Sequence, residues 1–471
     1  MKRMRRGAET GGRAVGAVTL VLAAAVMLGC EGCRPAPHDP RRPAPCGPLP
    51  PPARLVRYVP PGAGAGAAPA FGLVLEDIDG IPTRIFNVSA WSRESGREPA
   101  LGAAAGRLFA REFALARERW DQYRRARASG MAGADWARYT DVIAPEDLPR
   151  AICAPVPLAQ EAIDGETAVV VAVGLNFPAH ADDAGGGDLF LFPKPVHPTG
   201  PYRTVRPGAG VRLLDYELEL GFVLLDDVDL GAIPSASELE GLVAFFAAND
   251  VSDREPIIRR SALRGPGTGF VEGKGQPGFL PLGPWMVHGE DLGLLALDCP
   301  RSLGMRLSVR EEGSVTLRQQ AGTGDMLAGP REILETLAAR VDAAAPGGTR
   351  TEMSTTVEGR ARYYPLALAA GGRAVLPRGS IVLTGTPAGT ALEAPEGRLS
   401  LLARALVRFQ SPRTRFLEDQ VVARDAEGYL AESDVVVGSI EELGTQWWPV
   451  SWQPAPAEPD PCARAAVGSG S

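Results

Sequence analysis

The sequence of 471 residues predicts an α+β fold that is dominated by a rolled or barrel-like sheet and preceded by a smaller domain. Short runs rich in Val, Leu, Ile and Phe recur across residues 166–450 and are joined by loops rich in glycine and proline, which is typical of strands. Pro330 to Val341 shows the clearest helical spacing in that region. A composition of 45% hydrophobic and 22% charged residues excludes a fibrous or wholly disordered chain, and a formal charge of −7 argues against a nucleic-acid-binding protein.

The first 29 residues differ from the rest and predict an export signal. Five basic residues precede Ala14–Gly29, an uncharged stretch of sixteen residues that is shorter than the roughly 20 apolar residues of a membrane-spanning helix. The sequence Leu28-Gly29-Cys30 resembles a bacterial lipoprotein processing site, at which Cys30 would be lipidated. An uncleaved helical anchor is the alternative. Either interpretation predicts an exported chain that stays at a membrane, on its periplasmic or outer face.

The rest of the chain divides by composition and pattern. The predicted parts are a proline-rich extended tether, a small N-terminal domain, the strand-rich domain and a disordered tail, at residues 30–53, 54–165, 166–450 and 451–471. The small domain includes a helix, because apolar residues recur at helical spacing between Leu108 and Tyr123. In an oxidising compartment Cys33, Cys46 or Cys462 could form disulfides, whose connectivity the sequence leaves open.

A row of carboxylates marks the most informative segment, Leu213–Phe222. In a strand, alternate side chains point to opposite faces, so Asp215, Glu217 and Glu219 would share one face at spacings of roughly 7 Å. Burying three like charges is costly without a cation, and oxygen ligands suit Mg²⁺, Mn²⁺ or Ca²⁺. The alternative is a solvent-exposed acidic face.

The order of several motifs resembles the fumarylacetoacetate hydrolase family. In sequence they are VGLNFPAH, LFPKP, LDYELEL, ANDVSDR, GK…PLGPW, TLRQQAGTGDM and VLTGTPAG, followed by a closing VGSIEELGTQWWPV. The resemblance covers about residues 165–450 and implies a strand-rich catalytic domain of that family's type. It further implies a divalent metal, with Mg²⁺ the first candidate, held by Glu217, Glu219 and Asp250. Asp215 would have a structural role beside them.

The resemblance also implies catalytic and substrate-binding residues. His180 matches the family's catalytic histidine, and Asp183 stands where the family has a glutamate that orients it. The list of implied substrate-binding residues is Arg254, Lys274 and Thr386, with Lys194 matching a family lysine of less certain role. The chain departs from the pattern at Ile257, where the family has glutamine, so this hydrogen bond to substrate is either lost or supplied by another residue.

These residues predict a metal-dependent hydrolase that cleaves a carbon–carbon bond in a 2,4-dioxo acid. Decarboxylation or isomerisation of related oxo-dicarboxylic acids is the alternative within the family. A lipoprotein that binds a small oxo-acid without turnover is the alternative from another class. The expected partners are a small oxo-acid and a membrane but no nucleic acid, and a homodimer is compatible with the resemblance.

Overall fold

The structure is a computed structural model, and it describes most of one compact unit, Cys46–Ser471. The described residues are 50–64, 67–130, 134–159, 161, 167–183, 189–264, 269–296, 300–341, 354–357, 360–392, 428–454 and 462. The predicted signal, nearly all of the tether and most of the tail lie outside them, and the predicted division into domains stays a prediction. Within the described ranges, no helix is long and apolar enough to cross a bilayer.

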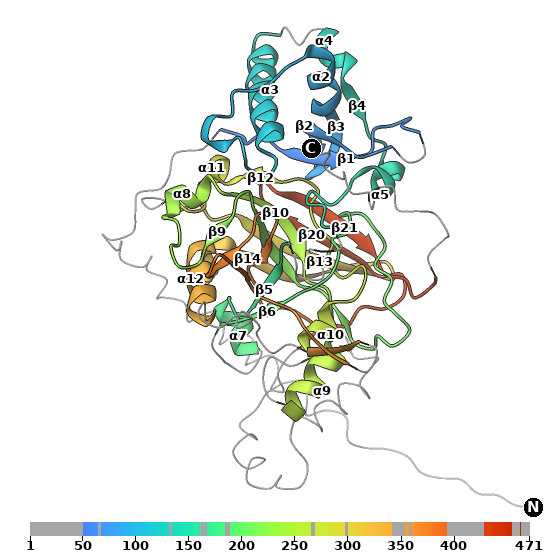
Figure 1. The fold of residues 1–471 in the computed structure, drawn as a ribbon. Helices are drawn as coiled ribbons and strands as arrows, with labels where there is room; N and C mark the ends of the chain where they lie inside the picture. The colour runs from blue at the N-terminus through green and yellow to red at the C-terminus, as the bar shows by residue number, and fades with distance from the viewer. Residues whose placement is uncertain are drawn as a thin grey trace, which may run out of the picture. The chain divides into compact units, whose positions relative to one another are not determined.

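The N-terminal part is a four-stranded antiparallel sheet with helices along it (Figure 1). Its strands in sheet order are β1 (Leu55–Tyr58), β2 (Ala70–Ile78), β3 (Ile81–Asn87) and β4 (Thr140–Val142). Its helices are α2 (Val88–Ser95), α3 (Ala110–Ala128), α4 (Ala134–Arg138) and α5 (Leu148–Ala151), with single 3₁₀ turns at Gly102–Ala104 and Pro145–Asp147. Asp79 and Gly80 both have positive φ, the conformation of a tight hairpin turn between β2 and β3. The predicted helix is confirmed as α3, and it buries Phe113, Leu115, Ala116 and Tyr123.

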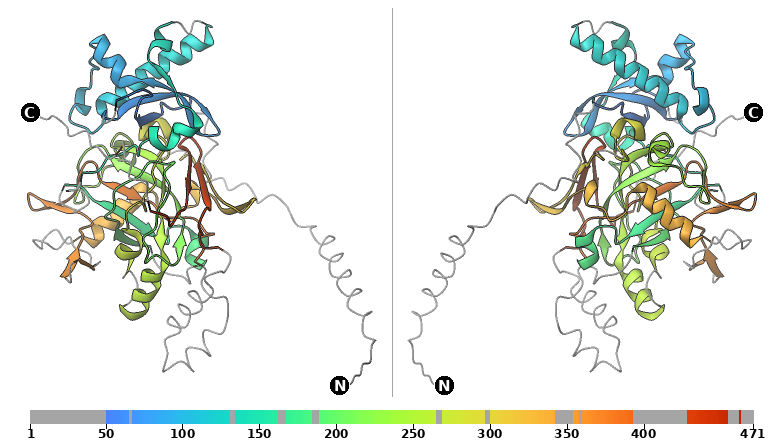
Figure 2. Two further views of the ribbon diagram at one scale, coloured as in Figure 1. Left: turned by 90° about the vertical axis from the view of Figure 1, so that its right-hand side faces the viewer. Right: turned by 90° about the vertical axis from the view of Figure 1, so that its left-hand side faces the viewer.

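A six-stranded mixed sheet forms the centre of the unit (Figures 1 and 2). Its strands in sheet order are β12 (Val287–His288), β10 (Val243–Asn249), β8 (Leu218–Leu224), β19 (Ile381–Leu383), β5 (Val170–Gly174) and β6 (Phe190–Pro193). Neighbouring strands are antiparallel except β19 and β5, which are parallel. Every residue of β8 and β10 is buried, so the apolar runs of the sequence cover both faces of the sheet.

Smaller sheets and short helices complete the unit. A second four-stranded sheet has the order β14 (Ser314–Gly322), β13 (Gly304–Glu311), β20 (Val435–Ile440) and β21 (Gly444–Pro449). The remaining sheets are β17 (Leu368–Ala370), β18 (Arg373–Leu376) and β9 (Val228–Asp229), then β11 (Ser252–Asp253) with β7 (Leu214–Asp215), and β15 (Ser354–Val357) with β16 (Arg360–Tyr363). The helices are α7 (Pro178–Asp183), α8 (Ala236–Glu240), α9 (Arg254–Arg264), α10 (Phe270–Lys274), α11 (Gly289–Leu292) and α12 (Pro330–Arg340), with a 3₁₀ turn at Thr323–Asp325.

These elements confirm the mixed helix and sheet class but not a barrel. No sheet of the described residues closes on itself, and the central sheet ends at β12 on one side and β6 on the other. The second sheet packs on the central one through β13 and β20 against β8, so the apolar face is covered without closure. The expected helix at Pro330 to Val341 is confirmed as α12.

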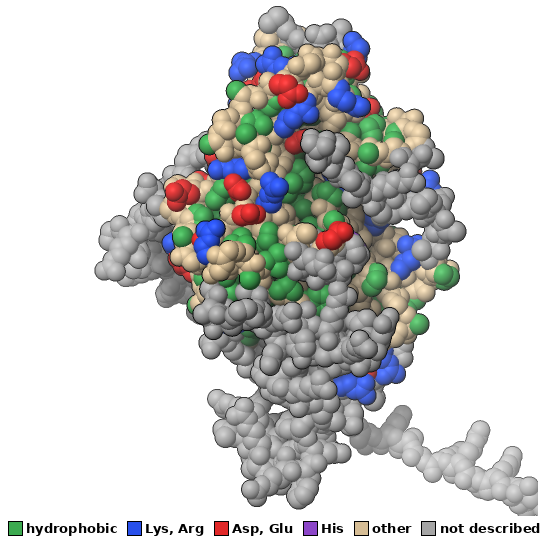
Figure 3. All heavy atoms as spheres, in the orientation of Figure 1, with side chains coloured by type: hydrophobic (Ala, Val, Ile, Leu, Met, Phe, Trp, Pro, Cys, Tyr) green, Lys and Arg blue, Asp and Glu red, His purple; other side chains and the backbone are tan. Residues whose placement is uncertain are grey.

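The surface of the described residues carries both signs of charge. On the face drawn in Figure 3, Arg side chains lie among Asp and Glu side chains. Arg117 of α3, for example, pairs with Glu290 and Asp291 at 2.9 Å each. The expected absence of a nucleic-acid partner stays a prediction.

A disulfide joins Cys153 to Cys462, whose Cα atoms are 5.4 Å apart across a sequence separation of 309 residues. The side chain of Cys153 is fully buried, and Arg57 donates from Nη2 to the Cys462 carbonyl at 3.0 Å. The predicted candidate Cys462 is therefore paired, and its partner is a cysteine that the sequence did not single out.

Removing this disulfide should destabilise the protein substantially. The crosslink limits the unfolded chain across a long loop, so Cys153→Ser should lower the free energy of unfolding by about 2–5 kcal/mol. Urea unfolding without reductant measures the change. Cys462→Ser and the double variant should match Cys153→Ser, because each removes the same bond. Equal stability of the wild type with and without reductant would contradict the prediction.

A buried histidine lies where α3 meets the central sheet. His288 is 8% exposed, and its ring meets that of Phe113 edge-on, with centroids 5.2 Å apart. The backbone N–H of Glu290 donates to His288 Nδ1 at 3.4 Å, so the imidazole caps α11. Burial, with a further contribution from Arg117, lowers the pKa of His288 to about 4. The residue therefore stays neutral in the folded protein at pH 7.

Acid should weaken this junction. The unfolded chain takes up the proton near pH 6.5 and the folded chain only near pH 4, so the free energy of unfolding falls as pH drops through that window. We expect His288 to account for roughly 2–3 kcal/mol of the loss between pH 7 and pH 4. His288→Asn keeps a side-chain acceptor for the cap but has no imidazole to protonate. Between pH 7 and pH 4 its free energy of unfolding should therefore fall by about 2–3 kcal/mol less than that of the wild type. Urea unfolding of both proteins at the two pH values tests it, and equal losses would refute it.

Candidate metal and substrate site

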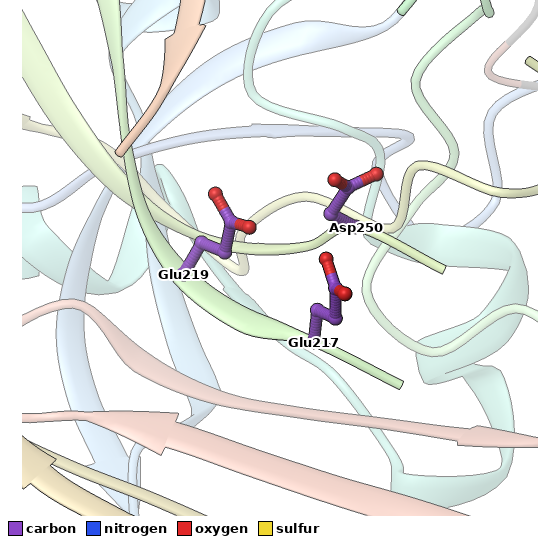
Figure 4. Close-up of side chains that lie close together, drawn as sticks. All are labelled: Glu217, Glu219 and Asp250. Carbon is purple, nitrogen blue, oxygen red and sulfur yellow. The ribbon is translucent and has the colours of Figure 1, made fainter. Parts of the chain in front are cut away.

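Three buried carboxylates converge at one end of β8 and β10. One oxygen from each of Glu217, Glu219 and Asp250 lies within 4.8 Å of the other two, as Figure 4 shows. The antiparallel register pairs Glu219 with Ala248, and the Asp250 N–H donates to the Glu217 carbonyl at 2.8 Å. Sheet register therefore brings together the three residues expected to hold a metal.

The carboxylate segment is not the single continuous strand that the sequence predicts. Leu214–Asp215 forms β7 and pairs with β11, and β8 begins only at Leu218. Between them, side chains replace sheet hydrogen bonds: Asp215 Oδ1 accepts from Tyr216 N at 2.8 Å, and Asn249 Oδ1 accepts from Glu217 N at 3.1 Å. The interruption leaves Glu217 and Glu219 directed to a common site.

Three buried cations face these acids. Lys274 Nζ lies 2.5 Å from Glu217 Oε2 and 2.7 Å from Asp250 Oδ2. Arg254 pairs with Asp215 at 2.7 Å and with Glu217 at 2.5 Å, and Lys194 Nζ lies 2.6 Å from Asp250 Oδ1. Arg254 and Lys274 thus both lie in the acid cluster, and their binding of substrate stays a prediction. Asp215 contacts Arg254, as a structural role requires.

Among the described residues, one carboxylate of the cluster has no paired cation. Asp215, Glu217 and Asp250 each contact at least one basic group, whereas Glu219 accepts a hydrogen bond from the Gly385 N–H at 2.7 Å. Burial, with the charges of Asp250 and Glu217, raises the pKa of Glu219 well above its usual range. Burial also acts to raise the pKa of Glu217, but Arg254, Lys274 and His180 outweigh it and hold that pKa at about 2.

This donor set fits a hard divalent cation. It offers carboxylate oxygens only, they are close enough to share one ion, and the site has one unbalanced negative charge. A divalent ion at Glu217, Glu219 and Asp250 would relieve the cost of burying Glu219 as an anion. The three carboxylates therefore form a site that is compatible with a divalent metal ion.

His180 lies beside the acid cluster on the short helix α7. Its ring is partly buried, and Nδ1 has no hydrogen-bond partner among the described residues. Burial lowers the pKa of His180 below 6.5, with Glu217 opposing the shift and Arg254 adding to it. A neutral imidazole at pH 7 can accept a proton. Asp183 is the last residue of the same helix, and its orienting role stays a prediction.

The hydroxyl of Thr386 is used within the protein. It donates to the Leu218 carbonyl at 3.1 Å and accepts from Gln319 Nε2 at 2.8 Å. Gln319 also accepts from the Leu218 N–H at 3.0 Å, which places this amide between Thr386 and the start of β8, next to Glu217 and Glu219. The predicted contact of Thr386 with substrate stays a prediction, and its hydroxyl proton points to Leu218 here.

Ile257 lies against the helix that carries Lys274. It is 6% exposed, and its Cγ1 atom is 2.8 Å from the place that a Cβ on Gly273 would occupy. The side chain therefore packs closely on a glycine next to Lys274. The loss or replacement of the substrate contact at this position stays a prediction.

Three residues near the site are not among the candidates predicted from the sequence. Gln319 and Asn249 hydrogen-bond the backbone of Leu218 and Glu217, and both lie within motifs that the family resemblance had marked. Tyr429 reaches the site because Leu430 N donates to Leu214 O at 2.9 Å, next to Asp215. Burial and Asp215 raise the pKa of its phenol. No local signal in the sequence indicates Tyr429.

Parts of the sequence are similar to those of known proteins. A family model described as "Fumarylacetoacetate (FAA) hydrolase C-terminal" matches residues 169–450. A Burkholderia multivorans protein with the provisional name of a hydrolase is 30% identical over 158 residues, which are 31% of this chain and 48% of the relative. A similarly named Burkholderia cenocepacia protein is 30% identical over 141 residues, 27% of this chain and 44% of the relative. The chain thus spans about half the length of these relatives.

Solved structures of low sequence identity also align. A probable 2-hydroxyhepta-2,4-diene-1,7-dioate isomerase from Mycobacterium abscessus is 19% identical and covers 86% of this chain and 100% of its own, with a TM-score of 0.46. A fumarylacetoacetate hydrolase from Exiguobacterium antarcticum is 18% identical and covers 85% of this chain and 100% of its own, also with a TM-score of 0.46.

Proposed function

This chain belongs to the fumarylacetoacetate hydrolase family, and on that premise we propose that it is a metal-dependent hydrolase of 2,4-dioxo acids of the acylpyruvate type. The observation that carries the proposal is the buried, convergent set of Glu217, Glu219 and Asp250 beside a neutral His180. Glu217, Glu219 and Asp250 would hold the ion, for which we propose Mg²⁺ because every donor is a carboxylate oxygen. When bound, it supplies Lewis-acid stabilisation of the negative charge that develops on the substrate oxygens.

The cluster's charge fits an anionic substrate. Its four carboxylates and three cations sum to one negative charge, so a divalent ion would bring the site to one positive charge. A substrate carboxylate would neutralise that charge. Among the described residues, the two ion pairs of Lys274 occupy two of its three N–H groups, which leaves one for a substrate oxygen.

The proposed reaction uses His180 as general base. It takes a proton from a water molecule whose oxygen bonds to the distal carbonyl carbon of the substrate. The bond between that carbon and the methylene group breaks, and its electron pair passes to the methylene carbon as the enolate of the 2-oxo acid. Proton return to that carbon gives a carboxylic acid and a 2-oxo acid. Lys274 and Arg254 would orient the substrate carboxylate.

Isotope labelling separates this reaction from its alternatives. The full-length chain, with Mg²⁺ or Mn²⁺, would be given acylpyruvates and oxaloacetate in ¹⁸O-labelled water. Hydrolysis puts labelled oxygen into the new acid, whereas decarboxylation releases CO₂ and isomerisation forms no new acid. Turnover of oxaloacetate alone, or acylpyruvate cleavage that survives metal removal by EDTA, would overturn the proposal.

We also propose that the chain is exported and held at a membrane by a lipid on Cys30. The basic and apolar leader supports this, and so does the Cys153–Cys462 disulfide, since such bonds persist in oxidising compartments. Metabolic labelling with palmitate tests the proposal. Label that persists in a Cys30→Ala variant would contradict it.

A further inference from the structure

Lysine is rare in this chain, and its positions are therefore informative. Of the 49 basic residues only three are lysines, at Lys2, Lys194 and Lys274. The first lies in the leader, and the other two are 0% and 2% exposed within the acid cluster. A chain that uses arginine almost everywhere else has two ammonium groups at one buried site. An ammonium differs from a guanidinium in its size and in the directions of its N–H groups.

The ammonium of Lys194 has an acceptor for each of its three N–H groups. Nζ lies 2.6 Å from Asp250 Oδ1, 2.7 Å from the Lys274 carbonyl oxygen and 3.2 Å from the Val251 carbonyl oxygen. Its own backbone is held at the edge of the sheet, where Lys194 N donates to the Val170 carbonyl at 2.9 Å. The side chain thus extends from the end of β6 to two other segments, and each of its three N–H groups has an acceptor there.

The acceptors of Lys194 connect the carboxylate triad with the substrate-binding candidate Lys274. Asp250 Oδ1 faces Lys194, and the other oxygen, Oδ2, faces Lys274 Nζ at 2.7 Å. The carbonyl that Lys194 holds is that of Lys274 itself, at the end of the five-residue helix α10. Lys194 therefore contacts a residue of the carboxylate triad and the backbone of a substrate-binding candidate with one group.

We propose that Lys194 is a positioning residue that fixes Asp250 and Lys274 relative to each other. The inference rests on the proposed function for its catalytic consequence, because it assigns Asp250 to the ion and Lys274 to the substrate. A tetrahedral ammonium can direct three N–H groups to acceptors on two segments, whereas a planar guanidinium is larger and directs its N–H groups in one plane. Lys194 is not a catalytic residue, since its three N–H groups are already used.

Charge and geometry can be separated by two substitutions. Lys194→Met removes the charge, and Lys194→Arg keeps it but changes the geometry. We expect both to lower kcat/KM on an acylpyruvate by about 100-fold, with the two variants within about threefold of each other. Arg373→Gln is the matched control, because the exposed side chain of Arg373 has its ion pair, within the described residues, with Asp229; its kcat/KM should stay within twofold of wild type. A Lys194→Arg variant with wild-type kinetics would show that charge alone matters and would overturn the proposal.

A spectroscopic measurement tests the same contacts without turnover. In full-length protein labelled with ¹⁵N at lysine Nζ, Lys194 and Lys274 should give two slowly exchanging ammonium signals. Each Lys194 variant should lose one signal and shift the other, that of Lys274, because its carbonyl has been released. An unchanged Lys274 signal in a folded variant would overturn the proposal.

If neither variant folds, measurements on the wild-type protein alone test the proposal. Addition of Mg²⁺ should shift the Lys274 signal and leave that of Lys194 slowly exchanging, since Lys194 keeps Asp250 Oδ1. Rapid exchange of the Lys194 ammonium, before or after Mg²⁺ is added, would overturn the proposal. Lack of all activity on 2,4-dioxo acids would instead refute the proposed function, while these signals would still report whether Lys194 holds Asp250 and Lys274.

Discussion

Glu219→Gln should abolish metal-dependent turnover while leaving the protein at least as stable as the wild type. The amide keeps an oxygen for the Gly385 N–H but removes the carboxylate that no described cation neutralises. Because burial disfavours the Glu219 anion, its removal costs the apo fold nothing electrostatically. We expect a loss of about 1,000-fold or more in kcat/KM and a Mn²⁺ dissociation constant raised about 100-fold. Steady-state kinetics, calorimetric titration and urea unfolding measure these three quantities.

Glu217→Gln is the matched control, because the same chemical change there should have a different structural result. Glu217 pairs with both Arg254 and Lys274 at 2.5 Å, so its neutralisation leaves two buried cations short of a partner. We expect it to lower the free energy of unfolding by about 3 kcal/mol as well as to weaken Mn²⁺ binding. Equal stability losses in the two variants, or undiminished Mn²⁺ binding by Glu219→Gln, would contradict the assignment of the site.

His180→Gln should remove turnover without removing metal binding. A general base contributes about 100- to 10,000-fold, so kcat should fall by that range at pH 7.5 while the Mn²⁺ dissociation constant stays within about threefold of wild type. Since the pKa of His180 lies below 6.5, wild-type kcat/KM should decline only at pH values below 6.5, as the imidazole becomes protonated. Kinetics across pH and a metal titration check both statements.

His197→Gln provides the control for this histidine change. His197 is exposed and lies outside the acid cluster, so its kcat should stay within about twofold of wild type. Normal turnover by His180→Gln would remove the base from the proposed reaction. Loss of Mn²⁺ binding by His180→Gln would instead indicate that the imidazole supports the ion.

Local patterns predicted the parts of the site that depend on local geometry. Alternation along a strand put Glu217 and Glu219 on one side, and the family resemblance added Asp250 as the third carboxylate of the set. Both hold in the structure, even though the backbone is interrupted at Tyr216 and Glu217. The helices beginning at Ala110 and Pro330 also follow from apolar periodicity.

The remaining features depend on contacts between segments that are distant in sequence. Lys194 and Asp250 meet although three strands separate β6 from β10 in the sheet order, and no spacing in the sequence encodes that contact. Gln319 meets Thr386 across two different sheets. The expected barrel was wrong for the same reason: strand content predicts sheets, but whether a sheet closes or is covered by a second sheet is decided by tertiary packing.

The Cys153–Cys462 bond changes the covalent topology of the molecule. Residues 153–462 form a closed covalent ring, and every proposed site residue from His180 to Thr386 is a member of it. A single peptide-bond cut between two of these residues would open the ring but release no fragment, because the pieces remain joined through the sulfur atoms. The metal-binding and substrate-binding segments are thus joined covalently along both arcs of the ring, one of which passes through the disulfide.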